Sequence, residues 1–175
     1  MILVRQMKLE DSFRIRDIDR SEMIDLIYKC ENGFLEEIMA EHECPNWVED
    51  DYNDIIFRYE QELKNGGTAF GAYKRDTLVG FGVLANKFRG KEHNQLQIDL
   101  MYVTREYRRQ GIGSRIFDAL SNAAIEKGAE HLYISSTETE SAVKFYSSHD
   151  SRITSEVDEE LFEKEPNDIH MIKRL

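Results

Sequence analysis

The spacing of apolar residues changes several times along the chain. Alternating or short apolar runs predict β-strands at residues 2–7, 68–73, 77–85, 95–104, 131–135, 151–157 and 168–173. Helical spacing predicts helices from Asp11 or Ser12 to the Asn32-Gly33 break, and at residues 47–63, 111–127 and 140–148. Residues 34–39 are expected to add a helical turn, and residues 41–46, 86–94 and 105–110 to form loops.

Helices and strands therefore alternate within one chain. No Gly-, Ser- or Pro-rich linker and no internal repeat divides it. The polar turn Lys74, Arg75 and Asp76 joins two of the strands as a hairpin. This order predicts one domain over residues 1–175, of the α/β (α+β) class with a mixed sheet.

Composition narrows the function classes. The 175 residues carry a formal net charge of −11, which opposes binding to the phosphate backbone of nucleic acid despite the arginines near residue 108. The same charge suits a cationic partner, although solubility alone explains an acidic surface equally well. The apolar runs are too short to span a membrane, so no membrane association is expected.

Cysteine and histidine usage indicates a reduced, metal-free protein. The N-terminus lacks the features of a secretory signal, so Cys30 and Cys44 are expected to be free thiols in a cytoplasmic protein. Neither cysteine has the local signature of a catalytic nucleophile. The five histidines form no ligand pair at metal-binding spacing, and we expect no metal.

A glycine-containing loop is the clearest chemical signal. Residues 108–114 read RRQGIGS and lie between an alternating strand and an amphipathic helix. Free N–H groups at a helix start, beside arginines, suit a diphosphate. Ile116 stands where a dinucleotide-binding fingerprint needs glycine, and the Gly-Lys-Ser/Thr of a Walker A loop is absent. The alternative is a surface turn whose glycines ease a strand-to-helix corner.

Two motifs together resemble the GNAT superfamily of N-acetyltransferases. Arg108, Gly111 and Gly113 match its Arg/Gln-x-x-Gly-x-Gly/Ala core, and the residues 142–146 (AVKFY) are similar to its Ala-x-x-Phe-Tyr helix. The chain departs from the family at Thr139, where asparagine is frequent, and at Asp150-Ser151, where a Gly-Phe pair is frequent. The resemblance implies a single domain with a mostly antiparallel sheet of about seven strands, flanked by about four helices.

The resemblance also implies acetyl-CoA as co-substrate. It assigns the diphosphate to the loop and the pantetheine arm to the strand before it. The implied cofactor-binding residues are Met101, Tyr102, Val103, Arg108, Arg109, Gln110, Gly111, Ile112, Gly113, Ser114, Thr139 and Tyr146. A bulge in the fourth predicted strand is implied to free backbone N–H groups, with that of Val103 facing the thioester carbonyl.

Direct attack by an amine on a thioester needs an acid and a base. Tyr146 is the candidate acid, since a phenol stays protonated at neutral pH; the alternative is that it only packs. The resemblance implies a base on one face of this strand, at Gln97 or Asp99, and Gln97 cannot titrate, which leaves Asp99 as the candidate base. Asp99 is expected on the strand face of Gln97 and Met101, opposite Leu96, Ile98 and Leu100. Asp99 has the alternatives of binding the substrate ammonium or pairing with an arginine.

The identity of the acceptor does not follow from the sequence. The resemblance implies an acyltransferase acting on a primary amine of a small molecule or a protein. The first helices are expected to shape the acceptor pocket, with Glu22, Glu31, Tyr28, Trp47 and Tyr52 as weaker candidates. A non-catalytic acyl-CoA-binding module of the same fold is the alternative, and a homodimer is common in such folds.

Overall fold

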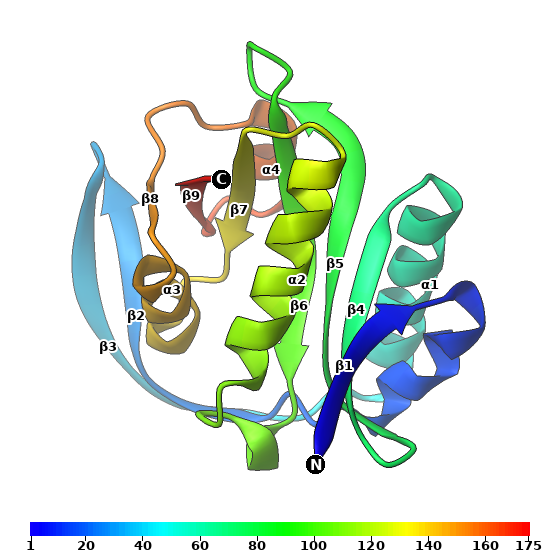
Figure 1. The fold of residues 1–175 in the computed structure, drawn as a ribbon. Helices are drawn as coiled ribbons and strands as arrows, with labels where there is room; N and C mark the ends of the chain where they lie inside the picture. Colours follow the sequence, from blue (N-terminus) through cyan, green and yellow to red (C-terminus); the bar gives the residue numbers. More distant parts are fainter.

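A computed structural model describes residues 1–175, which form one sheet of seven strands with a separate hairpin beside it (Figure 1). The strand order is β1-β4-β5-β6-β7-β9-β8, and every neighbouring pair is antiparallel except β6 and β7. The strands are β1 (Ile2–Met7), β4 (Thr68–Lys74), β5 (Thr77–Arg89), β6 (Gln95–Val103), β7 (His131–Ser136), β8 (Ser151–Ile153) and β9 (Ile169–Arg174). The predicted fold class is confirmed.

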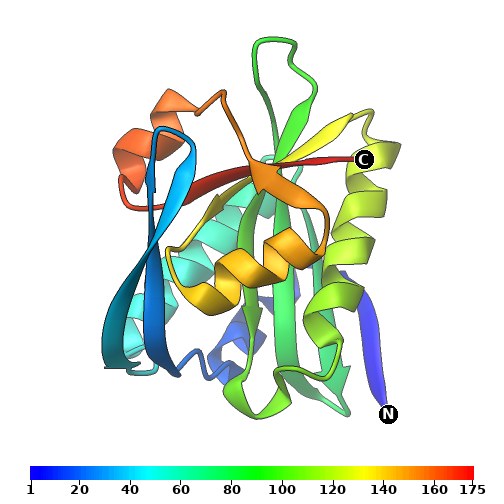
Figure 2. The ribbon, with the colours of Figure 1, turned by 90° about the vertical axis from the view of Figure 1, so that its left-hand side faces the viewer.

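Helices cover both faces of this sheet. A 3₁₀ helix (Leu9–Asp17) and α1 (Glu49–Lys64) lie on one face, and α2 (Ile112–Glu126) and α3 (Glu140–Ser148) lie on the other, as the two views show (Figures 1 and 2). The buried apolar residues accordingly form two clusters, one under α2 and α3 and one under α1. None of the helices combines the length and the apolar character needed to cross a membrane.

The predicted helix before Asn32-Gly33, and the helical turn after it, are wrong. Only its first part is helical, as 3₁₀ helix, and the rest forms a hairpin of β2 (Glu22–Glu31) and β3 (Phe34–Cys44). Asn32 and Gly33 have φ of 52° and 79°, which is the left-handed pair that a tight hairpin turn requires. The turn chemistry therefore decided the structure over an apolar spacing that also fitted a helix.

Two smaller differences lie in the second half of the chain. β5 continues to Arg89 through residues predicted as loop, and the strand predicted at residues 151–157 ends at Ile153. A short helix that the pattern did not predict, α4 (Glu159–Lys164), follows. Its N-cap is Asp158, whose carboxylate accepts a hydrogen bond from the N–H of Leu161 at 3.0 Å. The remaining predicted helices and strands are confirmed within a few residues.

Candidate functional site

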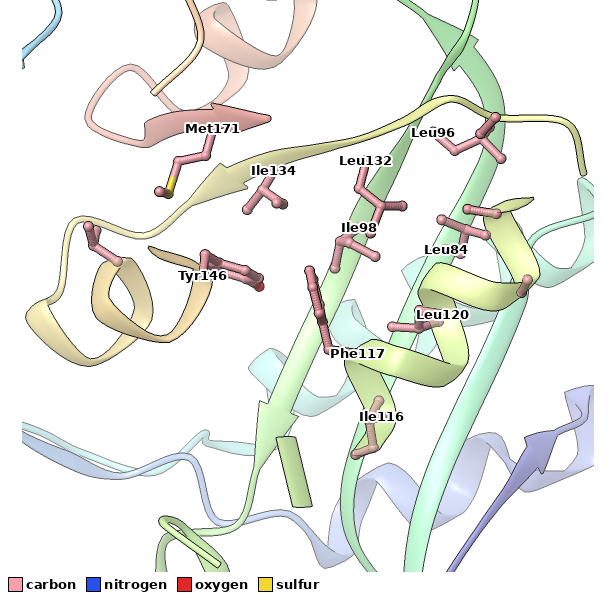
Figure 3. Close-up of a cluster of buried hydrophobic side chains, with 14 of the residues drawn as sticks. Leu84, Leu96, Ile98, Ile116, Phe117, Leu120, Leu132, Ile134, Tyr146 and Met171 are labelled. Carbon is pink, nitrogen blue, oxygen red and sulfur yellow. The ribbon is translucent and has the colours of Figure 1, made fainter. Parts of the chain in front are cut away.

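The central strands β6 and β7 separate partway along their length. Their parallel pairing runs from Gln95 to Ile98 on β6 and from His131 to Ile134 on β7, while β6 stays paired with β5 as far as Val103. In Figure 3 the two strands run apart, with Tyr146 of α3 between them. We call this region the strand opening. The edge of β6 that faces it has no strand partner after Ile98.

Backbone N–H groups of β6 point into the strand opening. The N–H of Thr104 donates to the carbonyl of Val79 on β5 at 2.9 Å. Because successive N–H groups of a strand point to opposite sides, those of Val103 and Met101 point away from β5, toward the opening. The predicted pantetheine strand thus presents two unpaired donors on its open edge, and Val103 is one of them.

A bulge in β6 lies at Asp99. Val83 pairs with Leu100 and its neighbour Leu84 pairs with Ile98, so Asp99 is the extra residue. The bulge was expected near Met101, Tyr102 and Val103, and it lies just before them.

The bulge reverses the expected alternation of the residues that follow it. Leu100 packs in the cluster under α1, on the side of Asp99, and Met101 packs in the cluster under α2 and α3. The prediction that Met101 shares a face with Asp99, opposite Leu100, is therefore wrong. One inserted residue in the strand is the reason, because it shifts every later side chain by one position.

The loop of residues 108–114, which we call the anion loop, has the backbone of an anion cradle. Arg109 and Gly111 have φ of 61° and 76°, and Gly111 is the N-cap of α2. None of the backbone N–H groups of residues 109–114 has an acceptor within the protein. Successive free N–H groups at a helix start attract a negative charge, and the helix dipole adds to this.

The Arg108 side chain does not extend into this cradle. Its guanidinium donates to the carbonyl oxygens of Val103 at 2.8 Å, Ser21 at 2.9 Å and Asp19 at 3.4 Å. Burial lowers the pKa of Arg108, which is half-buried among these carbonyls. In the structure the Arg108 side chain thus braces the loop against the end of β6 and the segment before β2. Arg109 is exposed and remains the arginine available to an anion.

The two sequence motifs meet in space. A side chain at Gly113 would begin 3.0 Å from the ring of Phe145, so glycine is needed for α3 to pack against the start of α2. His149, which the sequence analysis did not single out, joins the same elements through its Nε2, 2.9 Å from the hydroxyl of Ser114. The anion loop is therefore held in place by the helix that carries Tyr146.

Tyr146 lies within the buried cluster and keeps its hydroxyl free. The side chain is 8% exposed, and its ring packs edge-on against Phe117 and Phe145. Figure 3 shows the ring extending from α3 toward β6. The hydroxyl makes no hydrogen bond within the protein, and it is not among the unpartnered polar atoms that are sealed from solvent. Burial, together with the nearby Tyr102 phenol and Asp168 carboxylate, raises the pKa of Tyr146, so it is a proton donor at neutral pH.

Thr139 occupies the N-cap of α3. Its hydroxyl accepts a hydrogen bond from the N–H of Ala142 at 3.4 Å, and its backbone forms an isolated bridge with Ile27 of β2. The Tyr28 N–H donates to the carbonyl of Glu138 at 2.7 Å. These contacts attach the hairpin β2–β3 to the end of β7. The hairpin is thus one wall of the site.

Asp99 is held by Arg58 of α1. The guanidinium donates to the two carboxylate oxygens at 2.6 and 2.9 Å and to the Asp99 carbonyl at 3.1 Å, and the Asp99 side chain is 5% exposed. Of the roles considered for Asp99, pairing with an arginine is the one that the structure contains. Both carboxylate oxygens of Asp99 thus accept charge-assisted hydrogen bonds from one guanidinium.

A second carboxylate, Asp168, immediately precedes β9 and lies beside the end of β7. Its oxygen accepts a hydrogen bond from the hydroxyl of Ser135 at 2.7 Å. Burial, reinforced by Glu165 and Glu138, raises the pKa of Asp168 to about 6, although the Ser135 bond opposes the shift. The sequence analysis missed Asp168 because it stands at the start of β9, far along the chain from every motif.

A groove of about 1140 Å³ lies between the hairpin β2–β3 and the segment of β8, α4 and β9. Asp168 and Glu138 are among its lining residues, and Asp168 is near enough to Tyr146 to raise the pKa of that phenol. Two of the weaker acceptor-pocket candidates, Tyr28 and Glu31, line this groove as well. Trp47 and Tyr52 instead pack in the cluster under α1.

No group of three or more His, Cys, Asp and Glu side chains in the structure is arranged to hold a metal ion. Cys30 and Cys44 are both free thiols. The strand opening brings together a buried phenol and unpaired backbone donors.

The chain was compared with known proteins by sequence. A model of the acetyltransferase (GNAT) family matches residues 32–150, which is more than half of the chain. The matched segment contains the anion loop and Tyr146. A search of curated protein sequences finds no match.

Solved structures resemble the chain over its full length. Nourseothricin acetyltransferase has a TM-score of 0.73 at 20% identity, covering 99% of this chain and 98% of that one. A putative streptothricin acetyltransferase from Bacillus anthracis, in complex with acetyl coenzyme A, has a TM-score of 0.74 at 17% identity, covering 100% and 99%. The PaiA N-acetyltransferase from Thermoplasma acidophilum, in complex with coenzyme A, has a TM-score of 0.66 at 16% identity, covering 100% and 99%. At these identities the likeness shows a shared fold.

Proposed function

Because the chain belongs to the acetyltransferase (GNAT) family, we propose that it is an N-acetyltransferase that transfers an acetyl group from acetyl-CoA to a primary amine. The observation that carries this proposal is the strand opening. There, unpaired N–H groups of β6 face the free hydroxyl of a buried tyrosine. Both substrates are bound together, and the amine attacks the thioester directly.

The residues of the anion loop fit the diphosphate of acetyl-CoA. The unpaired N–H groups of residues 109–114 and the start of α2 supply the donors, and the exposed Arg109 supplies the charge. Met101, Tyr102 and Val103 offer the open edge of β6 to the pantetheine arm. Thr139 stands at the opposite side of the opening. Acetyl-CoA supplies the activated acetyl thioester.

Two groups of the chain assist the departure of the thiolate. The N–H of Val103, with that of Met101 beside it, donates to the carbonyl oxygen as negative charge develops there. Tyr146 donates its proton to the sulfur, and its raised pKa keeps that proton in place until the thiolate forms.

The proton of the acceptor ammonium goes to Asp168. Arg58 already occupies both oxygens of Asp99. Asp168 has only the Ser135 bond, and its pKa of about 6 is nearer to neutrality than that of an ordinary carboxyl. In the complete reaction the carbon–nitrogen bond forms and the carbon–sulfur bond breaks, and the ammonium nitrogen loses two protons. Asp168 takes the first and later releases it to water, and the second replaces the proton that Tyr146 gives to the thiolate, so Tyr146 ends protonated. Asp99 then serves to hold Arg58 in place.

The similar folds of nourseothricin and streptothricin acetyltransferases support an amine acceptor of small-molecule size. The test is an assay of acetyl-CoA consumption with a panel of primary amines, paired with calorimetry of acetyl-CoA binding. We expect the wild type to acetylate at least one of the amines. We expect Asp168→Asn to lower the rate of that reaction about 100-fold, which is the usual contribution of a general base.

The pH dependence of kcat/KM distinguishes a catalytic base at Asp168 from a carboxylate with only a structural role. For the wild type, kcat/KM is expected to rise with pH through about 6 and then level off, since the carboxylate must be ionised to accept the proton. Asp168→Asn is expected to lose this rise. Binding of acetyl-CoA without turnover on any amine would contradict the proposal and indicate a non-catalytic acyl-CoA-binding module.

A further inference from the structure

A histidine connects the end of α3 to the anion loop. His149 is the C-cap of α3, and its Nε2 lies 2.9 Å from the hydroxyl oxygen of Ser114 in the first turn of α2. In Figure 2 the end of α3 lies beside α2, near the start of that helix. The ring packs against Phe117 of α2 and Phe145 of α3, with ring centroids 5.3 and 4.4 Å away. The imidazole is therefore held in one position beside the anion loop.

The partners of Nδ1 determine which nitrogen of the ring carries a hydrogen. Nδ1 lies 2.8 Å from the carbonyl oxygen of Phe145, and a carbonyl can only accept. The Ser148 hydroxyl donates to the same carbonyl at 2.7 Å, so its oxygen, 3.1 Å from Nδ1, is a second acceptor. In the neutral ring of His149, Nδ1 therefore carries the hydrogen and Nε2 is an acceptor.

The protonation state of His149 consequently sets the direction of the Ser114 hydroxyl. Beside a neutral ring, Ser114 donates its single hydroxyl hydrogen to Nε2. Beside a protonated ring, Nε2 donates to the Ser114 oxygen, and the hydroxyl hydrogen is free for another acceptor. Ser114 thus gains a free donor when His149 takes up a proton.

An anion in the loop favours one of these two states. Ser114 is the third residue of α2, and its backbone N–H is one of the unpaired donors of the anion loop. The protonated ring adds a positive charge beside these donors and releases the Ser114 hydroxyl to join them. Both effects stabilise a bound anion, so a bound anion in turn stabilises the protonated ring.

The charged groups around His149 come from three elements and from the loop. Lys173 of β9 donates to the His149 carbonyl at 2.8 Å, and it lies 4.0 Å from Asp150 at the end of α3. Asp118 of α2 and Arg109 of the anion loop are exposed. Asp, Lys and Arg side chains ordinarily keep their charges between about pH 6 and 8, whereas imidazole ordinarily changes its charge there. The ring is therefore the group of this set that links the loop to pH.

We propose that His149 is a positioning residue that orients the Ser114 hydroxyl, so that binding of the acetyl-CoA diphosphate is coupled to the uptake of a proton by the ring. This inference rests on the proposed binding of acetyl-CoA at the anion loop. A site that takes up a proton on binding has its highest affinity at low pH, and the added affinity is lost as pH rises.

Calorimetry of acetyl-CoA binding to the full chain at pH 6 and at pH 8 tests the coupling. The variant His149→Asn offers an amide donor to the Phe145 carbonyl and removes the ionisable ring. Its Kd is expected to exceed that of the wild type about tenfold at pH 6 and less than about twofold at pH 8, as is usual for coupling between two sites.

Other groups that titrate in this range do not affect the comparison. The 3′-phosphate of acetyl-CoA changes its charge near about pH 6, and the pKa of Asp168 is also about 6. Both are present with the wild type and with His149→Asn, so the ratio of the two Kd values does not contain them. Calorimetry in two buffers of different ionisation enthalpy then counts protons, and the wild type is expected to take up more than the variant.

A second variant keeps the ring and removes the group that it orients. Ser114→Ala leaves the packing of His149 against the two phenylalanines in place. Its change in Kd between pH 6 and pH 8 is expected to match that of His149→Asn rather than that of the wild type. This variant distinguishes coupling through the hydroxyl from a stabilising role of the ring.

The matched control is His93→Asn. His93 is exposed in the loop before β6, at the end of that strand opposite to the anion loop. Its φ of 49° is one that asparagine tolerates. The control is expected to show the wild-type Kd at both pH values.

The outcomes separate this inference from the proposed function. A change in Kd with pH that is the same in the wild type and His149→Asn, or that Ser114→Ala retains in full, overturns the coupling and leaves acetyl transfer standing. Failure of the wild type to bind acetyl-CoA at either pH overturns the coupling and the proposed function together. Because no amine is present in these experiments, the roles proposed for Tyr146 and Asp168 do not enter the result.

Discussion

The two sides of the strand opening differ in the chemical groups that they present: main-chain N–H groups on one side and carboxylate side chains on the other. The anion loop presents backbone N–H groups, and its geometry depends on two residues with positive φ at the start of one helix. The groove presents carboxylate side chains from the hairpin β2–β3, from α4 and from the start of β9. One side offers main-chain donors, and the other offers carboxylate side chains that converge from distant segments.

This difference determines how each side tolerates change. A backbone cradle is insensitive to most side-chain substitutions and is damaged only where a substitution alters φ or places charge in the cradle. The groove is a sum of separate carboxylates, so a single substitution removes only one of several charges. Asp168 is the exception, because we assign it a proton-transfer role at the point where the two sides meet.

The largest expected effect is at the backbone side. Gly111→Glu places a carboxylate at the start of α2, where the diphosphate of acetyl-CoA is proposed to bind. Two like charges about 4 Å apart near a protein surface repel by about 4 kcal/mol, so we expect acetyl-CoA affinity to fall at least about 100-fold. Calorimetry measures the loss.

A matched control exists at the other end of the same helix. Gly128 also has positive φ, 88°, and a side chain there meets nothing within 4 Å. Gly128→Glu therefore introduces the same residue and similar backbone strain away from the anion loop. It is expected to bind acetyl-CoA as the wild type does. Equal affinities in the two variants would remove the anion loop from the binding site.

The backbone side could be predicted from sequence because its determinants are local. Gly111 and Gly113 stand at a strand-to-helix corner, and neighbouring residues alone specify that conformation. The contacts of Arg108 within the protein did not follow from the sequence, because its partners Asp19 and Ser21 lie far back along the chain. No local pattern shows which carbonyls a long side chain will reach.

The carboxylate side could not be predicted because its residues are far apart in sequence. Asp168 is adjacent to the site only through the pairing of β7 with β9, which brings Ser135 within 2.7 Å of it. The apolar spacing before Asn32 is compatible with a helix and with a strand, and the tight turn at Asn32-Gly33 favours the strand of a hairpin. Asp99 was placed on the correct face, and its partner Arg58 lies on a helix 41 residues earlier.

The next effect tests the phenol between the two sides. Tyr146→Phe removes a hydroxyl that makes no hydrogen bond within the protein, so packing and stability should change little. Because a general acid contributes about 10²- to 10⁴-fold, we expect kcat to fall about 100-fold. Acetyl-CoA affinity should stay near the wild-type value. Steady-state kinetics with calorimetry checks both, and a wild-type kcat would exclude Tyr146 as the acid.

The third effect concerns the buried pair of Asp99 and Arg58. Arg58→Ala leaves a carboxylate that is 5% exposed without its cation. Removing one member of a buried pair costs about 3–5 kcal/mol, and because the Arg58 side chain is 34% exposed we expect about 2 kcal/mol in the free energy of unfolding. Chemical denaturation measures the loss.

A double variant distinguishes pairing from catalysis at Asp99. Arg58→Met/Asp99→Asn removes both charges and is expected to recover most of the lost stability. Its kcat should stay within about tenfold of the wild type, since Asp168 remains as the proton acceptor. A loss of kcat comparable to that of Asp168→Asn would assign the base to Asp99 instead.

The fourth effect is a gain in stability on the carboxylate side, which appears only at the higher pH. Because burial raises the pKa of Asp168 from its usual value to about 6, the folded state binds this proton more tightly than the unfolded state. The contribution of Asp168 to stability therefore falls as pH rises from about 4 to about 6. At higher pH the buried charge destabilises the fold. Asp168→Asn keeps an acceptor for Ser135 and removes the charge.

This variant is expected to be more stable than the wild type by about 2 kcal/mol at pH 8, after allowance for partial exposure, and nearly equal at pH 4. Denaturation at the two pH values measures the difference. Asp118→Asn, at an exposed position on α2, is the control for loss of a charge. If the stability gain of Asp168→Asn over the wild type were no larger at pH 8 than at pH 4, the charged carboxylate would not destabilise the folded state. A variant that gains stability and loses turnover would show that the Asp168 carboxylate lowers the stability of the fold and is needed for proton transfer.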